Sequence, residues 1–274
     1  FLGDRIGGKL LDQAIDKSGF RYSRMYNDCA DADILLLGNS RGLGFYQPYI
    51  EEITQKSTFN LSYNGMPIEL GAALVKDYLE KYEKPEVVVI DVTMCDRAND
   101  QLIAGFASYM TNSEHLSDLI RTTNKTNYLA TQFSHLYRYN SEVFQRALYY
   151  STQPNDEHWI VDRTIAASMI EMADAGAYDY RIDAYGLEEL KALIELIQQQ
   201  NIRVELIVSP YFPAFRAQMG GLDEFISIVS TTTNLPVHDY SESLMKPAYF
   251  GDFQHINKKG SEVFMKRLKQ DGIF

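Results

Sequence analysis

Three side chains in this sequence combine the residue types of a nucleophilic catalyst. Ser40 follows an apolar run and a glycine, while Asp252 and His255 lie three positions apart near the carboxyl end of the chain. A serine hydroxyl needs a base to accept its proton, and a third group must hold that base in the correct tautomer. The Asp-x-x-His spacing lets the carboxylate contact imidazole Nδ1 and leaves Nε2 for the serine. The pattern predicts Ser40 as nucleophile, His255 as base and Asp252 as orienting acid.

Each of these signals is weak by itself. A Gly-x-Ser after a strand is a common turn, and most Asp-x-x-His pairs in loops are ordinary exposed polar residues. Their joint occurrence is more informative, because the serine follows the first expected strand and the Asp-His pair precedes the last expected helix. Open parallel sheets place their sites at the carboxyl ends of the strands, so both segments are expected at one edge.

Apolar runs alternate with amphipathic stretches along the chain, which predicts strands and helices wound into a mostly parallel sheet. The expected strands cover 33–37, 58–61, 87–92, 204–208 and 237–240, and the expected helices cover 46–54, 67–82, 187–200, 222–230 and 258–269. The run of valines in 87–92 is typical of a strand buried on both faces. The predicted fold is a three-layer α/β/α flavodoxin-like sandwich with about five mostly parallel strands and a helical insertion.

The stretch from 97 to 180 interrupts this alternation. It is polar, helix-like and rich in Tyr and Asn, and it carries turn residues at 153–156. We interpret 1–274 as a single domain and 97–180 as a helical insertion or cap within it. Since insertions at this edge build walls over a site, we expect substrate choice to depend on this part.

Composition excludes several function classes. The formal net charge is −11, which disfavours a nucleic-acid partner because such binding needs Lys and Arg to neutralise phosphates. The two cysteines, Cys29 and Cys95, give neither zinc-ligand spacing nor a disulfide framework, although one bridge stays open. We expect no cofactor and no metal. No run approaches the length of a membrane span, and the opening residues read equally as an arbitrary start or as the remnant of a removed signal or anchor.

At these residues the sequence resembles the SGNH hydrolase superfamily of GDSL-like esterases. Gly38-Asn39-Ser40 is similar to the first block of that family, 60–65 to the second, and Asp252 to His255 to the last. The resemblance covers roughly residues 30–96 and 185–270. It implies an oxyanion hole in which the amides of Ser40 and Gly65 donate to the developing negative charge, where each donor contributes roughly 3–4 kcal/mol.

The third block departs from the family pattern. The family places an asparagine there as a third oxyanion donor, whereas 91–96 contains none. Asn64 or Thr93 are alternative side-chain donors, although a turn residue and a strand cap are the more ordinary roles for them. Arg41, next to the nucleophile, is a candidate for binding an anionic or sugar substrate, and pairing with a neighbouring carboxylate is an equally ordinary role.

The longer motif from Leu36 to Arg41, with 59–61 and 209–211, is similar to a divergent branch of bacterial envelope proteins. This resemblance implies an extracytoplasmic location. It also implies a serine esterase or acyltransferase that acts on small, acetyl-type esters of carbohydrate through an acyl-enzyme. The alternative is a catalytically weak module that binds glycan or assists envelope assembly. A nucleotide-binding function is disfavoured, because the turn at 38–42 lacks the required glycine spacing.

Overall fold

The computed structural model describes residues 2–172, 178–181 and 183–274. The chain divides into two compact units. The helical unit comprises Phe1–Asp31, Glu69–Glu83 and Asn99–Glu157, and the sheet unit comprises Ala32–Ile68, Lys84–Ala98 and His158–Phe274. All predicted site residues belong to the sheet unit.

The sheet unit is built on a five-stranded parallel sheet. Its strands are β1 (Ile34–Leu37), β2 (Thr58–Asn60), β3 (Val87–Asp91), β5 (Arg203–Val208) and β7 (Val237–Asp239). They lie in the order β2-β1-β3-β5-β7, which is the flavodoxin-like order once the two strands outside this sheet are set aside. The predicted α/β class and the five parallel strands are confirmed, and each predicted strand lies within two residues of its observed bounds.

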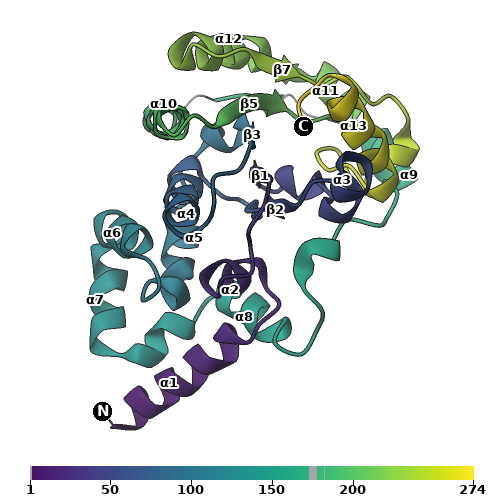
Figure 1. The fold of residues 1–274 in the computed structure, drawn as a ribbon. Coiled ribbons are helices and arrows are strands. Elements are labelled where there is room, and N and C mark those ends of the chain that lie inside the picture. Colours follow the sequence, from purple (N-terminus) through teal and green to yellow (C-terminus); the bar gives the residue numbers. More distant parts are fainter. Residues whose placement is uncertain (1, 173–177, 182) are drawn as a thin grey trace. The chain divides into compact units, whose positions relative to one another are not determined.

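Helices cover both faces of this sheet, which makes three layers (Figure 1). Helices α3 (Gln47–Thr54) and α13 (Lys258–Gln270) contact each other, as do α10 (Ala184–Gln199) and α12 (Leu222–Thr233). Alternate strand residues such as Ile34, Leu36 and Val89 share a buried core with Ile50 and Phe264 of the first helix pair. The strand residues between them point to the opposite face, because successive side chains of a strand alternate.

The loops after the strands meet at the carboxyl edge of the sheet. Leu36 of β1 is in register with Asn60 of β2 and with Val89 of β3, so these strands end at similar levels. The first strand therefore delivers Ser40, and the third delivers Asp91, to one edge. This is where an open parallel sheet carries its sites.

The helical unit contains most of the remaining helices. They are α1 (Leu2–Asp16), α2 (Arg21–Tyr26), α4 (Ile68–Lys81, whose first residue belongs to the sheet unit), α5 (Asp100–Gly105), α6 (Glu114–Thr123), α7 (Lys125–Phe133) and α8 (Glu142–Tyr149). Its buried aromatic cluster joins Tyr22 of α2 to Phe106 and Tyr109. Helix α1 was not predicted from the sequence, because its three glycines weaken the helical pattern.

The rest of the chain adds short elements. These are α9 (Ala167–Met172), α11 (Pro213–Ala217), the 3-10 helices Gly42–Gly44, Val92–Asp96, Phe106–Tyr109, His135–Tyr139, Asp156–His158 and Pro247–Tyr249, and a two-stranded parallel sheet of β4 (Tyr178–Asp179) and β6 (Met219–Gly220). Neither of its strands was predicted: β4 lies at the end of the stretch 97–180, which was expected to be helical, and β6 lies just before the helix expected at 222–230. Cys29 and Cys95 are both free thiols. Within the described ranges, no helix has the length and apolar character needed to cross a membrane.

Candidate active site

The three side chains singled out by their types lie in one hydrogen-bonded chain. The Ser40 hydroxyl oxygen lies 2.8 Å from Nε2 of His255. Nδ1 of the same imidazole lies 2.8 Å and 2.9 Å from the two carboxylate oxygens of Asp252. With Nδ1–H donating to the carboxylate, Nε2 is left as the acceptor for the serine proton, which is the tautomer a general base requires.

The Asp252 and His255 side chains lie on a tight loop closed by an antiparallel bridge between Phe250 and Ile256. Inside it, the Gly251 amide donates to the His255 carbonyl. The Asn257 side-chain amide donates to the carbonyls of Ala248, Phe250 and Arg163, while its oxygen caps α13 by accepting from the Gly260 amide. The loop is thus fixed at its base, so few backbone torsions are left to move the imidazole.

The Asp252 carboxylate is held in its charged form. Burial pushes its pKa upward, but the hydrogen bond and the charge of His255, together with the amides of Gln254 and His255, outweigh burial and lower the pKa below its usual range. Its Oδ1 accepts hydrogen bonds from both of these backbone amides and from Nδ1 of the imidazole. The Arg163 guanidinium adds a contact of 3.5 Å from the exposed side. An ionised Asp252 stabilises the imidazolium that forms when His255 takes a proton.

Ser40 lies on a sharp turn that needs small neighbours. A side chain at Gly42 would place its Cβ 2.3 Å from the Ser62 hydroxyl, and one at Gly38 would lie 3.0 Å from the Gly42 Cα atom. The Asn39 side-chain oxygen accepts a hydrogen bond from the Arg41 backbone amide, and the side-chain amide of buried Asn60 donates to the Gly42 carbonyl. These contacts hold the turn after β1 and keep the serine at the surface of the cavity described below.

The two residues predicted to supply backbone oxyanion donors border one cavity. Ser40 and Gly65 both line this cavity, and the Ser40 N–H donates to no acceptor within the described ranges. Gly65 has a φ of +71°, a conformation that favours glycine, in a turn closed by the Met66 amide donating to the Tyr63 carbonyl. Asn64, the adjacent candidate, is exposed and also lines the cavity.

Thr93 lines the cavity, but its hydroxyl proton already takes part in a hydrogen bond. Its hydroxyl donates to the buried Asp91 carboxylate at 2.6 Å, and its amide donates to the same oxygen at 3.0 Å. A hydroxyl has one proton, so this geometry gives Thr93 an accepting oxygen rather than an oxyanion donor. The Asn39 side-chain amide donates to the Thr93 hydroxyl oxygen over a long 3.4 Å. The role that the third-block asparagine has in the resembling family is therefore not reproduced by Thr93 in this arrangement.

The predicted substrate contact of Arg41 also looks different in the structure. Arg41 is only 4% exposed, and its guanidinium donates to the backbone carbonyls of Ser209, Pro210 and Gln254. Its carbon centre lies 3.3 Å from the centroid of the Tyr211 ring. The charged end thus points into the protein, although part of the residue lines the cavity. A contact from this guanidinium to substrate stays a prediction, and these bonds do not favour it.

The cavity at Ser40 is small and polar, with a volume of about 130 Å³. Several residues of its wall were not predicted as site residues, among them Asp96, Arg97, Tyr178 and Tyr180. The Tyr180 hydroxyl donates to the Thr93 carbonyl at 3.2 Å, and burial raises its pKa well above the usual value, so it stays a neutral phenol. The Tyr178 hydroxyl donates to Asp96 at 3.3 Å, and Arg97 pairs with the same carboxylate.

An aromatic group continues beside the cavity. The ring centroid of Tyr178 lies 5.8 Å from that of Phe215, and Phe215 is stacked on Phe253, which lies between Asp252 and His255, at 5.7 Å with an interplanar angle of 3°. Aromatic identity alone did not reveal these residues in the sequence, because most aromatic side chains serve packing. Only Phe253 could have been noticed in the sequence, because it lies between the expected acid, Asp252, and the expected base, His255.

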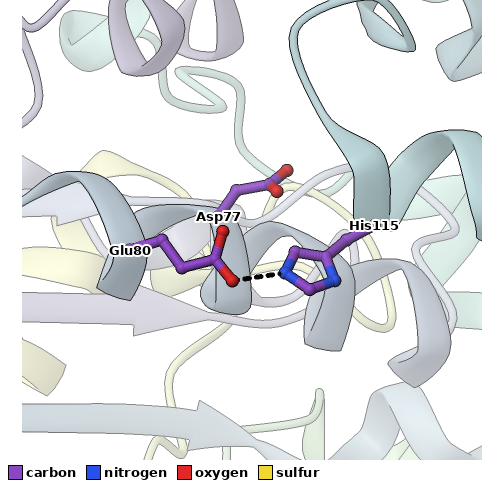
Figure 2. Close-up of side chains that lie close together, drawn as sticks. All are labelled: Asp77, Glu80 and His115. Carbon is purple, nitrogen blue, oxygen red and sulfur yellow. Dashed lines mark hydrogen bonds and ion pairs between the residues drawn. The ribbon is translucent and has the colours of Figure 1, made fainter.

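One group of side chains has metal-ligating types. Asp77 and Glu80 of α4 and His115 of α6 bring ligand atoms within 4.8 Å of one another. Figure 2 shows the His115 ring paired with Glu80, at 2.8 Å, and the Asp77 carboxylate directed away from that pair. The Asp77 oxygens accept instead from the hydroxyls of Tyr26 and Ser113, at 2.5 Å and 2.8 Å. Hydrogen bonds within the helical unit account for this arrangement, so the group carries no metal assignment.

Comparisons with known proteins return little. No protein-family model matches the chain, and no curated protein matches it. Among solved structures, the chain is similar to an acetyl xylan esterase, AlAXEase, with 12% sequence identity and a TM-score of 0.41 over 87% of this chain and 98% of that one. At this level of similarity the comparison carries no functional argument, so function has to be argued from the site itself.

Proposed function

We propose that this protein is a serine esterase of the SGNH type, which cleaves or transfers small acyl groups through an acyl-enzyme on Ser40. The observation that carries the proposal is the unbroken chain of hydrogen bonds from the Ser40 hydroxyl through His255 to Asp252. The serine also borders a cavity, and its own amide is available to donate. Nucleophile, base, orienting acid and one oxyanion donor thus lie together.

The reaction follows from this geometry. As the Ser40 oxygen bonds to an ester carbonyl carbon, its proton passes to Nε2 of His255, and Asp252 stabilises the resulting imidazolium. The negative charge on the former carbonyl oxygen faces the amides of Ser40 and Gly65. The C–O bond to the alcohol then breaks, and the alcohol leaves with the proton from His255. Water, or a second alcohol, repeats these steps on the acyl-enzyme and regenerates the Ser40 hydroxyl.

The cavity supports a small acyl group. Pockets for drug-sized ligands measure about 300–1,000 Å³, whereas the space at Ser40 is about 130 Å³. Its wall carries phenol, carboxylate and guanidinium groups, from Tyr178, Asp96 and Arg97, that suit the hydroxyls of a sugar better than a lipid chain. We therefore extend the proposal to acetyl-type esters of carbohydrate. A site of action in the cell envelope is also part of the proposal and rests on the sequence resemblance alone.

An ester series tests this proposal. Nitrophenyl acetate and acetylated oligosaccharides should be hydrolysed with a kcat/KM at least about tenfold above that for the octanoyl ester, since about one decade corresponds to 1.4 kcal/mol of differential binding in the transition state. Ser40→Ala is the matched control and should lose turnover while keeping its circular-dichroism spectrum. A preference for the octanoyl ester would contradict the acyl-size argument.

The competing function is a glycan-binding or envelope-assembly module of low activity. The engaged hydroxyl of Thr93 favours it, because it leaves the hole without the third donor expected from the resemblance. Folded wild-type protein that binds acetylated glycans in calorimetry but releases no acetate would support this module and exclude the esterase.

A further inference from the structure

Arg41 occupies a position that joins four segments at the carboxyl edge of the sheet. Its Nη2 donates to the Ser209 carbonyl, and to that of Pro210 at 3.4 Å, just after β5. Its Nη1 donates to the Gln254 carbonyl at 3.0 Å, in the loop between Asp252 and His255. The residue itself directly follows Ser40. One guanidinium therefore ties the nucleophile's turn to the loop that carries the base.

The charge of Arg41 is matched inside the protein. Its Nε lies 3.9 Å from Oδ2 of Asp91, a carboxylate that is fully buried at the end of β3. That oxygen also accepts from the Ser209 amide at 3.3 Å, so Asp91 and Arg41 hold the same end of β5 from two sides. The Tyr211 ring covers the guanidinium at 3.3 Å, a favourable cation–π contact. These partners keep the plane of the guanidinium in one orientation.

A planar fork suits this position better than a point charge. Arg presents several N–H donors in fixed directions, while the Lys ammonium is a compact charge on a flexible stem. The three carbonyls that Arg41 contacts come from Ser209, Pro210 and Gln254, which lie on two different loops. Lys can bond to only part of this set in one rotamer.

From these contacts we infer that Arg41 is a positioning residue, which fixes the distance between the Ser40 hydroxyl and the His255 imidazole by holding the Gln254 carbonyl. It acts through the loop and does not contact the substrate. The inference rests on the proposed esterase function. It predicts an effect on the rate of the chemical step rather than on substrate affinity, because a displacement of about 1 Å in a reacting pair costs about 100-fold in rate.

Two variants and one control test this inference with a fluorophosphonate probe, which forms a covalent bond to an activated serine. Arg41→Met should lower the maximal labelling rate by about 100-fold, and Arg41→Lys by about tenfold, with the half-saturating probe concentration changed by less than about threefold. The control is Arg21→Lys, which alters a buried arginine of the helical unit paired with Asp156 at 2.7 Å. It should lower stability without changing labelling.

Hydrogen exchange of the peptide covering 249–257 gives a readout that does not depend on activity. Exchange should rise in Arg41→Met and, to a smaller extent, in Arg41→Lys, and should stay at the wild-type level in Arg21→Lys. All assays use temperatures at which circular dichroism shows each variant folded. If Arg41→Met does not fold, the comparison of Arg41→Lys with wild type decides.

The outcomes separate the two claims. A wild type that is never labelled, with faster loop exchange in the Arg41 variants, would remove the esterase function and leave the positioning of the loop intact. A labelled wild type with unchanged rate and exchange in the Arg41 variants would overturn the inference alone. A raised half-saturating concentration with an unchanged maximal rate would also overturn it and assign Arg41 to substrate binding.

Discussion

The Asp252→Asn variant tests how much the negative charge of the Asp252 carboxylate contributes to the site. The carboxylate accepts three hydrogen bonds through Oδ1, from Nδ1 of His255 and from the amides of Gln254 and His255. An asparagine oxygen can keep the two backbone amides in place, so the loop should hold its shape. What changes is the partner of Nδ1, since the carboxamide brings N–H donors and no charge.

The expected loss of rate depends on how the asparagine side chain contacts the His255 imidazole. If the carboxamide nitrogen faces Nδ1, the imidazole is held with its proton on Nε2, and Ser40 meets a donor instead of an acceptor. In serine proteases the equivalent exchange lowers kcat by about 10⁴-fold, which corresponds to roughly 5.4 kcal/mol at about 1.36 kcal/mol per decade. We expect a loss of about 10³- to 10⁴-fold here, because Arg163 and solvent reach the exposed side of the carboxylate.

The assay is the maximal rate of fluorophosphonate labelling together with the melting temperature. Asp252→Asn should label about 10³-fold more slowly. Its free energy of unfolding at pH 7, followed through the melting temperature, should fall only by the lost charge-assisted hydrogen bond, about 1.5–3 kcal/mol. Asp252→Ala also releases the two backbone amides and should be less stable than Asp252→Asn. A labelling rate within about tenfold of wild type in a folded Asp252→Asn protein would refute the proposed role of Asp252.

Three further expectations follow from the same geometry. Because the pKa of Asp252 is lower in the folded protein than in the unfolded chain, where it is about 3.9, the ionised carboxylate stabilises the fold above that pH. The difference in unfolding free energy between wild type and Asp252→Asn should therefore be largest at pH 7. Melting curves should show it shrink as the pH falls through and below about 4. Thr93→Val removes a hydrogen-bond donor from Asp91 and should lower the free energy of unfolding, measured with urea, by about 1–3 kcal/mol. The rate of labelling should change by less than tenfold. A rate about 100-fold lower would show that Thr93 is an oxyanion donor. Gly65→Ala should destabilise by about 1–2 kcal/mol, since its φ of +71° strains any side chain. It should also slow labelling by displacing the N–H of residue 65, and an unchanged rate would contradict that displacement.

The sheet could be predicted because its strands have clear limits in the sequence. The valine run of β3 and the leucine run of β1 are apolar without interruption and end at Asp91 and Gly38, so their bounds follow from composition. The small sheet of β4 and β6 could not be predicted, because each strand has two residues and pairs with a partner about forty positions away. No local pattern marks such a pairing.

The candidate site divides in the same way. Ser40, Asp252 and His255 could be found because their spacing and flanking elements are local, and the structure brings the three together. The direction of the Arg41 guanidinium depends on carbonyls at 209, 210 and 254, and the engagement of Thr93 depends on which proton Asp91 accepts. These are three-dimensional facts about polar partners, and a one-dimensional pattern does not contain them.

The most direct test of the account is to map the residue that a fluorophosphonate modifies in the folded protein. The account predicts a single adduct on the peptide that contains Ser40, absent in Ser40→Ala and formed at least about 10³-fold more slowly in His255→Ala. Folded wild-type protein that forms no adduct, or an adduct on another residue that persists in Ser40→Ala, would contradict it.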